Sequence, residues 1–291
     1  MSIDPDVAIG ATLPPQRFSW TANDVQTYHL AIGAGSRPLD HAELRYLDDA
    51  KPQVLPTFAT VAATFHATEA PRVQFPGIDI DLAKVVHGSQ EVITSGPIPA
   101  AGEAETITRI TEIWDKGSAA VIVQEAVTTA PDGTELWRTR SSIFARGEGG
   151  FGGERGPSNK IEMPTRTPDA EVAVPILPQQ ALMYRMCGDR NPLHSDPEFA
   201  RAAGFPRPIL HGLCTYAMIA KAVTDTVLDG DSTLLRSIGT RFAGVVYPGE
   251  TLACRIWDED GRFLVGVSVP DREDAPILAD TIVTTGNLSI R

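Results

Sequence analysis

Apolar residues in the second half of the chain follow two different periods, and each period predicts one kind of element. Residues 213–228 are rich in alanine and apolar on almost every face, which indicates a helix that is buried on all sides. The β-branched or alternating runs that follow are bounded by Gly, Pro and Asp, as is typical of strands, at 237–242, 251–258, 263–269 and 277–284. A run of strands around one buried helix predicts an α+β fold with an antiparallel sheet.

Two shorter helices are predicted upstream of the buried one. Residues 179–187 have a helical pattern that is closed by Gly188, a residue type that favours helix C-termini. Asp196 is an N-cap residue followed by a proline at the first helical position, and Gly204 ends this second helix. The chain between the two helices is therefore a short loop whose backbone is fixed by glycine and proline.

Short similarities between the two halves of the chain predict an internal duplication. The similar segments occur in the same order at offsets of roughly 145 to 155 residues, which is the size of one domain. They pair 24–28 with 181–184, 55–58 with 210–213, and 113–117 with 256–261. We expect a first repeat at 1–146, a linker at 147–160 and a second repeat at 161–291. Pro56, near the start of the helix expected in the first repeat, predicts a shortened or open helix there.

The linker contains one motif that suggests a nucleotide site. Gly147, Gly149 and Gly152 match G-x-G-x-x-G directly after a strand-like run at 141–145. A dinucleotide site requires a helix to begin at this loop, whereas the helix-breaking residues 155–158 follow here. We therefore interpret the segment as a linker and not as a phosphate-binding loop.

The loop between the first two predicted helices places an acid, an amide and a base within six residues, namely Asp189, Asn191 and His194. On a bent loop, Asp189 and His194 can face one cavity and move protons there. Each residue alone is more simply explained as part of a turn or of the surface, but the three together beside a buried helix indicate a site. The first repeat has no counterpart of this pair after Tyr28, so we expect the chemistry on the second repeat only.

Gly212 stands where the buried helix is expected to begin. The N–H groups at a helix start have no partner within the helix, and the helix dipole favours negative charge there. A glycine also lets a ligand oxygen approach the backbone closely. Gly212 is therefore a candidate oxyanion-hole donor, with close packing or capping as the alternative explanation.

A metal site is a second interpretation of the same region. His194, Asp196 and His211 match the His-x-Asp…His pattern of two-histidine, one-carboxylate iron sites. However, Asp196 is expected to cap the helix that follows it. His211 also comes only 17 residues after His194, which leaves no room for the strands that usually separate such ligands. We therefore predict no metal.

Charge and composition narrow the classes of partner and the location. The chain has 291 residues, of which 42% are hydrophobic, so it can bury a sizeable core. Its net charge of −12 argues against nucleic acid and anionic membranes as partners. The three cysteines follow no disulfide or metal spacing, and we find neither a signal peptide nor an apolar run of about 20 residues. These features predict a cytoplasmic protein that does not bind membranes.

The second repeat contains a pattern that spans residues 184–214. It consists of Tyr-Arg-x-x-Gly-Asp-x-Asn-Pro-Leu-His-x-Asp-Pro-x-x-Ala, followed by Gly-Phe-x-x-Pro-Ile-Leu-His-Gly-Leu-Cys. This pattern resembles the hydratase 2 motif of the MaoC-like (R)-specific enoyl-CoA hydratases, and residues 86–90 and 114–117 resemble the first repeat of two-repeat members. The resemblance implies a double hot-dog fold, in which each repeat is a curled antiparallel sheet around a long helix, and a homodimer.

The resemblance also implies roles for individual residues. Asp189 and His194 are similar to the catalytic pair, and Asn191 to the amide that holds the water or orients its neighbour. Gly212 is similar to the oxyanion donor. The substrate contacts implied by position or by local positive charge are His87, Gly88, Lys116, Arg190 and Phe242.

The implied activity is the reversible syn hydration of a trans-2-enoyl-CoA to a (3R)-hydroxyacyl-CoA in the β-oxidation of fatty acids or steroid side chains. We expect His194 and Asn191 to hold the water and Asp189 to protonate C2, although the sequence leaves the reverse assignment of acid and base open. This chemistry requires no metal or organic cofactor. An open helix near Pro56 would make room for a long or bulky acyl group.

Other functions fit the same fold. They are an acyl-thioesterase, a dehydratase acting on acyl-carrier thioesters, and a non-catalytic subunit that binds acyl-CoA. A pure binding subunit has no need of a proton-transfer pair, so Asp189 and His194 argue against the last of these.

Overall fold

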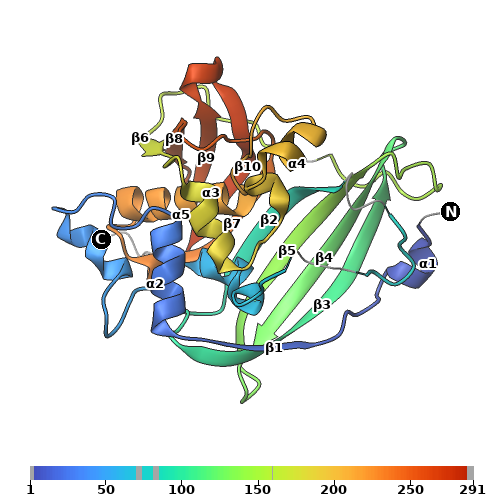
Figure 1. Cartoon of the computed structure of the whole chain (residues 1–291), viewed down its shortest axis with the longest axis horizontal. Helices are drawn as coiled ribbons and strands as arrows, with labels where there is room; N and C mark the ends of the chain where they lie inside the picture. Colours follow the sequence, from blue (N-terminus) through green and yellow to red (C-terminus); the bar gives the residue numbers. More distant parts are fainter. Residues whose placement is uncertain (1–2, 70–73, 81–84, 159, 287–291) are drawn as a thin grey trace.

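The computed structural model describes residues 3–69, 74–80, 85–158 and 160–286. Within these residues the strands form a single antiparallel sheet in the order β1-β3-β4-β5-β2-β7-β10-β9-β8-β6 (Figure 1). The first five strands along the chain are β1 (Gln16–Trp20), β2 (Val85–Thr94), β3 (Gly102–Asp115), β4 (Ala119–Thr129) and β5 (Glu135–Arg146). The other five are β6 (Ala170–Pro175), β7 (Leu235–Phe242), β8 (Thr251–Asp258), β9 (Arg262–Val269) and β10 (Ala275–Thr285). The strands predicted in the second half are therefore confirmed to within two residues.

The order of the strands shows the internal duplication directly. From its outer edge inward, the first half of the sheet runs β1-β3-β4-β5-β2, and the second half runs β6-β8-β9-β10-β7. Each strand of the first half therefore has a counterpart in the second half at the same place. The similar segments around Trp114 and Trp257 lie in the counterpart strands β3 and β8.

The two half-sheets are joined through their innermost strands. β2 pairs with β7 over five residue pairs, from Ser89 opposite Arg241 to Ile93 opposite Ser237. A bulge interrupts the pairing of β2 with β5 between His87 and Ser89, just before the shared segment begins. The joined sheet has no edge at its centre, so backbone groups of the two repeats satisfy one another there.

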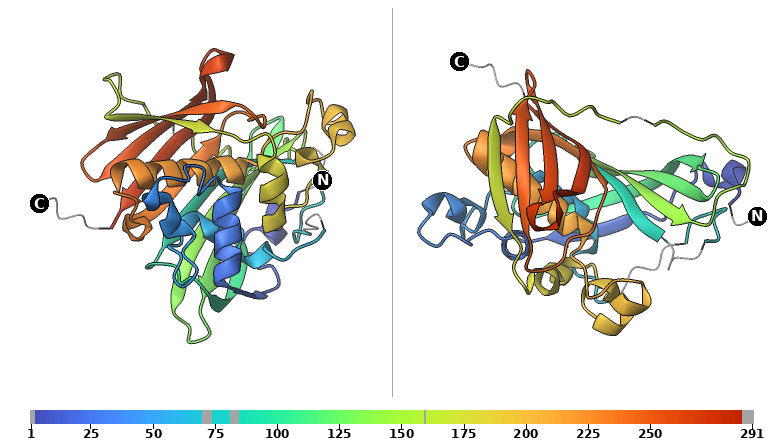
Figure 2. Two further views of the ribbon diagram at one scale, coloured as in Figure 1. Left: turned by 60° about the vertical axis from the view of Figure 1, so that its left-hand side comes forward. Right: turned by 90° about the horizontal axis from the view of Figure 1, so that it is seen from above.

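The central helix α5 (Gly212–Val227) lies against the second half-sheet (Figure 2). Almost all of its faces are buried, which confirms the apolar, alanine-rich pattern. The shorter helices are α1 (Pro5–Ala8), α2 (Ala22–Ala31), α3 (Gln180–Tyr184) and α4 (Pro197–Ala202), and α2 and α3 lie side by side (Figure 1). Among the described residues, no helix has both the length and the apolar character needed to span a membrane.

The described residues of the first repeat contain no counterpart of the long α5 helix. Short 3-10 turns, η2 (Pro56–Thr60) and η3 (Ala62–Thr64), occupy its place in the chain. Pro56 is the first residue of η2, as the shortened helix predicted there requires. The remaining 3-10 turns are η1 (His41–Tyr46), η5 (Arg185–Cys187), η6 (Pro192–His194), η7 (Ser232–Leu234) and η8 (Pro270–Arg272).

The glycine-rich segment after β5 is held by a carboxylate of the first repeat. Asp115 accepts hydrogen bonds from the N–H groups of Gly117, Gly150 and Gly152 at 2.8 to 2.9 Å. In the described part of this segment no helix begins after the G-x-G-x-x-G motif. The N–H groups that a phosphate would need are thus committed to Asp115, which supports the interpretation of this segment as a linker. The proposed repeat boundaries stay a prediction.

A buried ion network attaches the first repeat to the C-terminal half of α5. Lys221 Nζ lies 2.8 Å from Glu43 Oε1 in η1 and 2.8 Å from Asp225 Oδ2 on α5. The Tyr46 hydroxyl donates to the other Asp225 oxygen at 2.7 Å. Lys221 and Glu43 are both buried, and Arg37 extends the network, with Nη2 2.7 Å from Glu43 Oε1.

A buried histidine also holds the segment of the first repeat that contains Tyr46 and Leu55. His29 on α2 lies with Nδ1 2.9 Å from the carbonyl oxygen of Tyr46, and its Nε2 accepts from the N–H of Leu55 at 3.3 Å. A carbonyl only accepts, so the ring is neutral with its hydrogen on Nδ1. Burial lowers the pKa of His29 from 6.5 to about 4.

This pKa predicts how stability depends on pH. Between pH 6.5 and 4 the unfolded chain binds a proton at His29 and the folded chain does not, so stability falls as the pH is lowered through this window. We expect the His29 contribution to fall by about 2 kcal/mol between pH 7 and pH 5. Urea unfolding of the wild type and of His29→Gln at both pH values measures it. The variant should be less stable at pH 7 and should lose less stability on acidification; equal losses would contradict the assignment.

Candidate active site

The loop that carries the candidate acid begins at a glycine that no other residue can replace without strain. Gly188 ends η5 in the left-handed conformation, with φ of 108°. A Cβ at this position would also collide with the backbone carbonyl of Thr64 in the first repeat. The predicted helix end at Gly188 is confirmed, and it sets the chain direction for Asp189.

Local hydrogen bonds then shape the loop. Asp189 Oδ1 accepts from the N–H of Asn191 at 3.1 Å, and Asn191 Oδ1 accepts from the N–H of Leu193 at 3.0 Å. These contacts form the turn that leads into η6 and His194. The turn uses one oxygen of each side chain, so the second Asp189 oxygen and the Asn191 amide nitrogen are left for other partners.

His194 is held with one ring nitrogen committed and the other available. Its Nδ1 lies 2.9 Å from the carbonyl oxygen of Ile209, and its side chain is 9% exposed. Because a carbonyl oxygen only accepts, Nδ1 carries the hydrogen, and Nε2 of the neutral ring has a free lone pair. A histidine in this state can accept a proton.

A second histidine lies directly against the first. The rings of His194 and His211 stack with their centres 3.7 Å apart and 29° between their planes. His211 Nε2 is 3.3 Å from the backbone carbonyl oxygen of Asp189. One potential ligand atom from each of Asp189, His194 and His211 lies within 4.8 Å of the others, so the structure brings the predicted acid and base together.

Burial and nearby charge set the protonation of this cluster. Burial lowers the pKa of His194, and the Asp189 carboxylate opposes this effect. The pKa of His211 lies well below its ordinary value, mainly because of burial and further because of neighbouring His194, with Arg185 acting in the same direction. Both rings are therefore neutral at pH 7.

Gly212 is the first residue of α5, as predicted, and the first repeat supplies part of its surroundings. A Cβ at Gly212 would lie 3.1 Å from two ring carbons of Phe242 on β7, so the close-packing explanation for this glycine also holds. The Phe242 ring in turn lies 4.8 Å from the ring of His87 on β2. Burial lowers the pKa of His87 to about 4. The β2–β7 junction therefore places His87 and Phe242 beside the start of α5.

Unpartnered polar atoms concentrate around this site. In the described part of the chain, four buried side-chain nitrogen or oxygen atoms lack a hydrogen-bond partner: His87 Nε2, Tyr184 Oη, Arg185 Nε and His211 Nδ1. The Tyr184 ring packs at a tilt against the His211 ring, with ring centres 5.0 Å apart and 53° between their planes. Leaving such atoms unpaired costs about 1–3 kcal/mol each, so a cluster of them marks a place built for function.

Three residues predicted to bind substrate, Lys116, Arg190 and Gly88, have described side-chain or packing contacts only with residues outside the Asp189, His194 and His211 cluster. Lys116 Nζ lies 3.3 Å from the carbonyl oxygen of Pro157 and 5.1 Å from the centre of the Trp114 ring. Arg190 Nε donates to the carbonyl of Ala67 at 3.2 Å. A Cβ at Gly88 would meet the Ser142 hydroxyl, which explains this glycine by packing.

The carboxylate of the iron-site pattern, Asp196, is committed to a helix cap. Asp196 Oδ1 accepts from the N–H groups of Glu198 and Phe199 and caps α4, as expected. The structure groups a different set, with one potential ligand atom from each of Asp189, His194 and His211 within 4.8 Å of the others. The absence of a bound metal stays a prediction.

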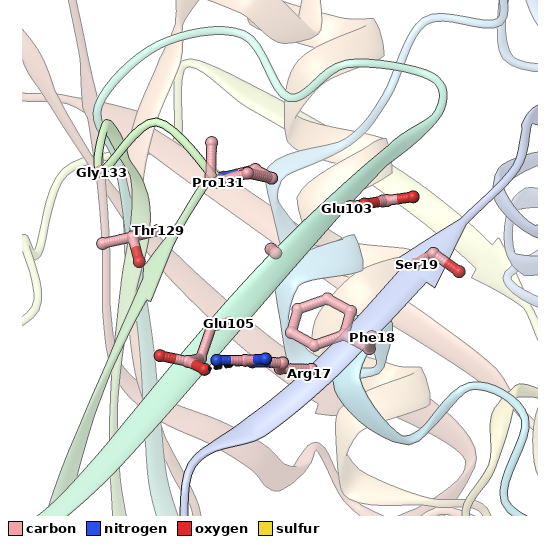
Figure 3. Close-up of a pocket in the computed structure, with 10 residues that line it drawn as sticks. Arg17, Phe18, Ser19, Glu103, Glu105, Thr129, Pro131 and Gly133 are labelled. Atoms are coloured by element: carbon pink, nitrogen blue, oxygen red, sulfur yellow. Dashed lines mark hydrogen bonds and ion pairs between the residues drawn. The ribbon is translucent and has the colours of Figure 1, made fainter.

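A surface pocket lies away from this cluster. It has a volume of about 650 Å³ and lies between β1, β3 and the turn that joins β4 to β5 (Figure 3). Arg17 and Glu105 form an ion pair of 2.7 Å across it, and Phe18 forms part of its wall. No residue of the 184–214 motif lines it, so we do not assign the reaction to this cavity.

Comparisons with known proteins cover both repeats. The family descriptions "MFE-2 hydratase 2 N-terminal domain" and "MaoC like domain" match residues 18–147 and 160–268. The chain is 61% identical over 279 residues to Enoyl-CoA hydratase ChsH3 of Mycobacterium tuberculosis, covering 96% of this chain and 98% of that protein.

Solved structures of similar proteins have the same fold. A MaoC-like dehydratase from Phytophthora capsici superimposes with a TM-score of 0.85 at 27% identity, covering 99% of this chain and all of that one. A Mycobacterium tuberculosis protein described as a double hot-dog fold superimposes with a TM-score of 0.55 at 11% identity, covering 96% of each chain, which bears on the fold alone. The predicted double hot-dog architecture is confirmed.

The electrostatics of the pair lead to a testable prediction. The Asp189 carboxylate is the charge that raises the pKa of His194 against the effect of burial, so Asp189→Asn should lower this pKa further. NMR titration of ring-labelled histidine in the wild type and the variant measures the change. An unchanged or higher His194 pKa in Asp189→Asn would mean that the two side chains do not interact.

Proposed function

Because this chain belongs to the MaoC-like hydratase 2 family, we propose that it catalyses the reversible addition of water to trans-2-enoyl-CoA to give (3R)-hydroxyacyl-CoA. One observation carries the assignment of residues: the buried pair of Asp189 and His194, with the Nε2 lone pair of His194 available, lies beside the first turn of α5. The R configuration rests on the family alone.

The geometry of His194 supports its role as the base. Its Nδ1 hydrogen is committed to Ile209, so Nε2 takes the proton from water while the water oxygen bonds to C3 of the enoyl thioester. The Asn191 amide nitrogen, which the turn leaves available, can hold the water oxygen. The Ile209 carbonyl then stabilises the imidazolium that forms, since a protonated ring strengthens this hydrogen bond.

Asp189 completes the addition as the acid. The His194 imidazolium passes its proton to the Asp189 carboxylate; the ligand atoms of the two side chains lie within 4.8 Å of each other, so this transfer needs at most one bridging water. The carboxyl formed in this way delivers the hydrogen to C2 while the electrons of the enolate return to form the thioester carbonyl, which restores the carboxylate and the neutral ring of the starting state.

Negative charge develops on the thioester oxygen between these steps. The N–H of Gly212, at the first position of α5, has no partner within the helix, and the helix dipole favours an anion there. The corresponding segment of the first repeat is only a five-residue 3-10 turn, η2, and therefore has no comparable helix dipole. This difference supports the proposal that only the second repeat catalyses the reaction.

Hydration can be separated from the other reactions of this fold by one assay. The wild type should remove the ultraviolet absorbance of trans-2-enoyl-CoA without releasing free thiol, whereas a thioesterase would release CoA. Asp189→Asn and His194→Gln should each lower the rate by about 10³-fold or more, while product binding and the unfolding midpoint stay close to wild type. Rates near wild type in either variant would refute the assignment of the pair.

The oxyanion role of Gly212 can be tested with two matched substitutions. The backbone of His211, with φ of −57° and ψ of 132°, tolerates a following proline. Gly212→Ala adds a Cβ near Phe242 but keeps the N–H, whereas Gly212→Pro adds similar bulk and removes the N–H. We expect kcat to fall about 10²- to 10³-fold further in Gly212→Pro than in Gly212→Ala. Equal losses in the two variants would show that the glycine serves packing only.

The proposal extends to the division of the chain into repeats, the substrate, the oligomeric state and the location. We assign residues 1–146 to a non-catalytic first repeat, 147–160 to the linker and 161–291 to the catalytic repeat; the ends of β5 and the start of β6 support this division. Acyl-CoA is the substrate, and the position of His87 beside Phe242 supports a contribution of the first repeat to its binding. A homodimer and a cytoplasmic location follow from the family resemblance and from the sequence, respectively.

A further inference from the structure

His211 contacts both members of the proposed catalytic pair although it takes no part in the reaction described above. Its ring covers the ring of His194 at 3.7 Å, and its Nε2 reaches the backbone carbonyl oxygen of Asp189 at 3.3 Å. In the chain it directly precedes Gly212 and is the N-cap residue of α5. One side chain therefore connects the base, the loop of the acid and the start of the central helix.

We propose that His211 is a positioning residue, whose neutral ring fixes the Asp189 loop and shields the His194 ring so that His194 stays an unprotonated base. This inference rests on the proposed function. It goes beyond that function because it assigns a role to a histidine that exchanges no proton with the substrate.

The protonation state of His211 follows from its contacts. The Asp189 carbonyl only accepts, so Nε2 of His211 carries the ring hydrogen and Nδ1 carries none. Nδ1 is buried and has no partner among the described residues, and the ring is 1% exposed. No acceptor is therefore present for a second ring hydrogen, and a protonated His211 would hold an unpaired charge in the interior.

The positively charged groups around His211 also disfavour its protonation. His194 stacks on one side, and Tyr184 of α3 packs near the ring with 5.0 Å between ring centres. The Arg185 guanidinium and a protonated His194 would both repel a second positive charge. Asp189 faces both histidines, and His87 approaches Asp189 from the first repeat. When His194 gains a proton in the reaction, it therefore meets a neutral aromatic face and not a second cation.

Two substitutions separate the two contacts of His211. His211→Gln places an amide N–H where Nε2 donates to the Asp189 carbonyl, but it removes the ring that covers His194. His211→Phe keeps a flat ring against His194 and removes the donor. A matched control is His29→Gln, since His29 is equally buried and also bonds a backbone carbonyl, but lies in the first repeat away from the cluster.

The pH profile of kcat/KM for enoyl-CoA hydration distinguishes a positioning role from a merely structural one. In the wild type, activity should fall on acidification as His194 is protonated, below its ordinary pKa of about 6.5. His211→Gln exposes His194 to water, so this acid limb should move to higher pH by about half a unit or more. In His211→Phe the limb should stay in place, while kcat falls about 10- to 100-fold and KM changes little. His29→Gln should leave the limb in place.

The inference is overturned if both His211 variants keep the wild-type kcat and the wild-type acid limb, or if His29→Gln moves the limb as far as His211→Gln does. NMR titration of the His194 ring gives a second readout that needs no substrate, and its pKa should rise in His211→Gln and stay low in His211→Phe. If the wild type does not hydrate enoyl-CoA, the proposed function fails, whereas the titration still decides the role of His211. If one of the two His211 variants does not fold, the other still tests the contact that it removes, by the pH profile and by the NMR titration.

Discussion

The pairing of β2 with β7 is the constraint on which the rest of the structure depends. It turns two five-stranded half-sheets into one sheet and fixes the position of one repeat relative to the other. His87 and Phe242, which lie at the ends of these strands, thereby come together beside the first turn of α5. The site is therefore a product of the junction: the second repeat supplies the proton-transfer groups, and the first supplies part of the wall that encloses them.

The duplicated halves differ most where the chemistry takes place. At the start of the central helix the second repeat has Gly212 as the first residue of the long helix α5, whereas the first repeat has only the short 3-10 turn η2. The second repeat continues from α3 into the Asp189 loop. The first repeat instead has His29 on α2, the counterpart helix, buried between two backbone groups. A buried histidine with both nitrogens occupied stabilises the fold, and one with a free nitrogen can react. The same residue type thus serves opposite purposes in the two repeats.

Local signals made the second repeat predictable. Its strands, the cap at Asp196 and the helix end at Gly188 depend on neighbouring residues, and the structure confirms them. The proximity of Asp189 and His194 was also predictable, because a short loop connects them. Contacts between distant residues were not: nothing in the pattern indicated that His211 would stack on His194 or that the Arg190 guanidinium would turn to Ala67. The sequence drew attention to His211 through the His-x-Asp…His pattern that it forms with His194 and through its place directly before Gly212, but neither signal indicated the stacking of the two rings.

The buried ion network of Lys221 has a consequence for the molecule as an energetic unit. The ammonium lies on the helix at the centre of the second repeat, and its buried partner Glu43 lies in the first. Detaching either repeat would break this ion pair together with the β2–β7 pairing and would expose to water the apolar core that both repeats share. The two repeats should therefore melt in a single cooperative transition, although the chain repeats one pattern twice.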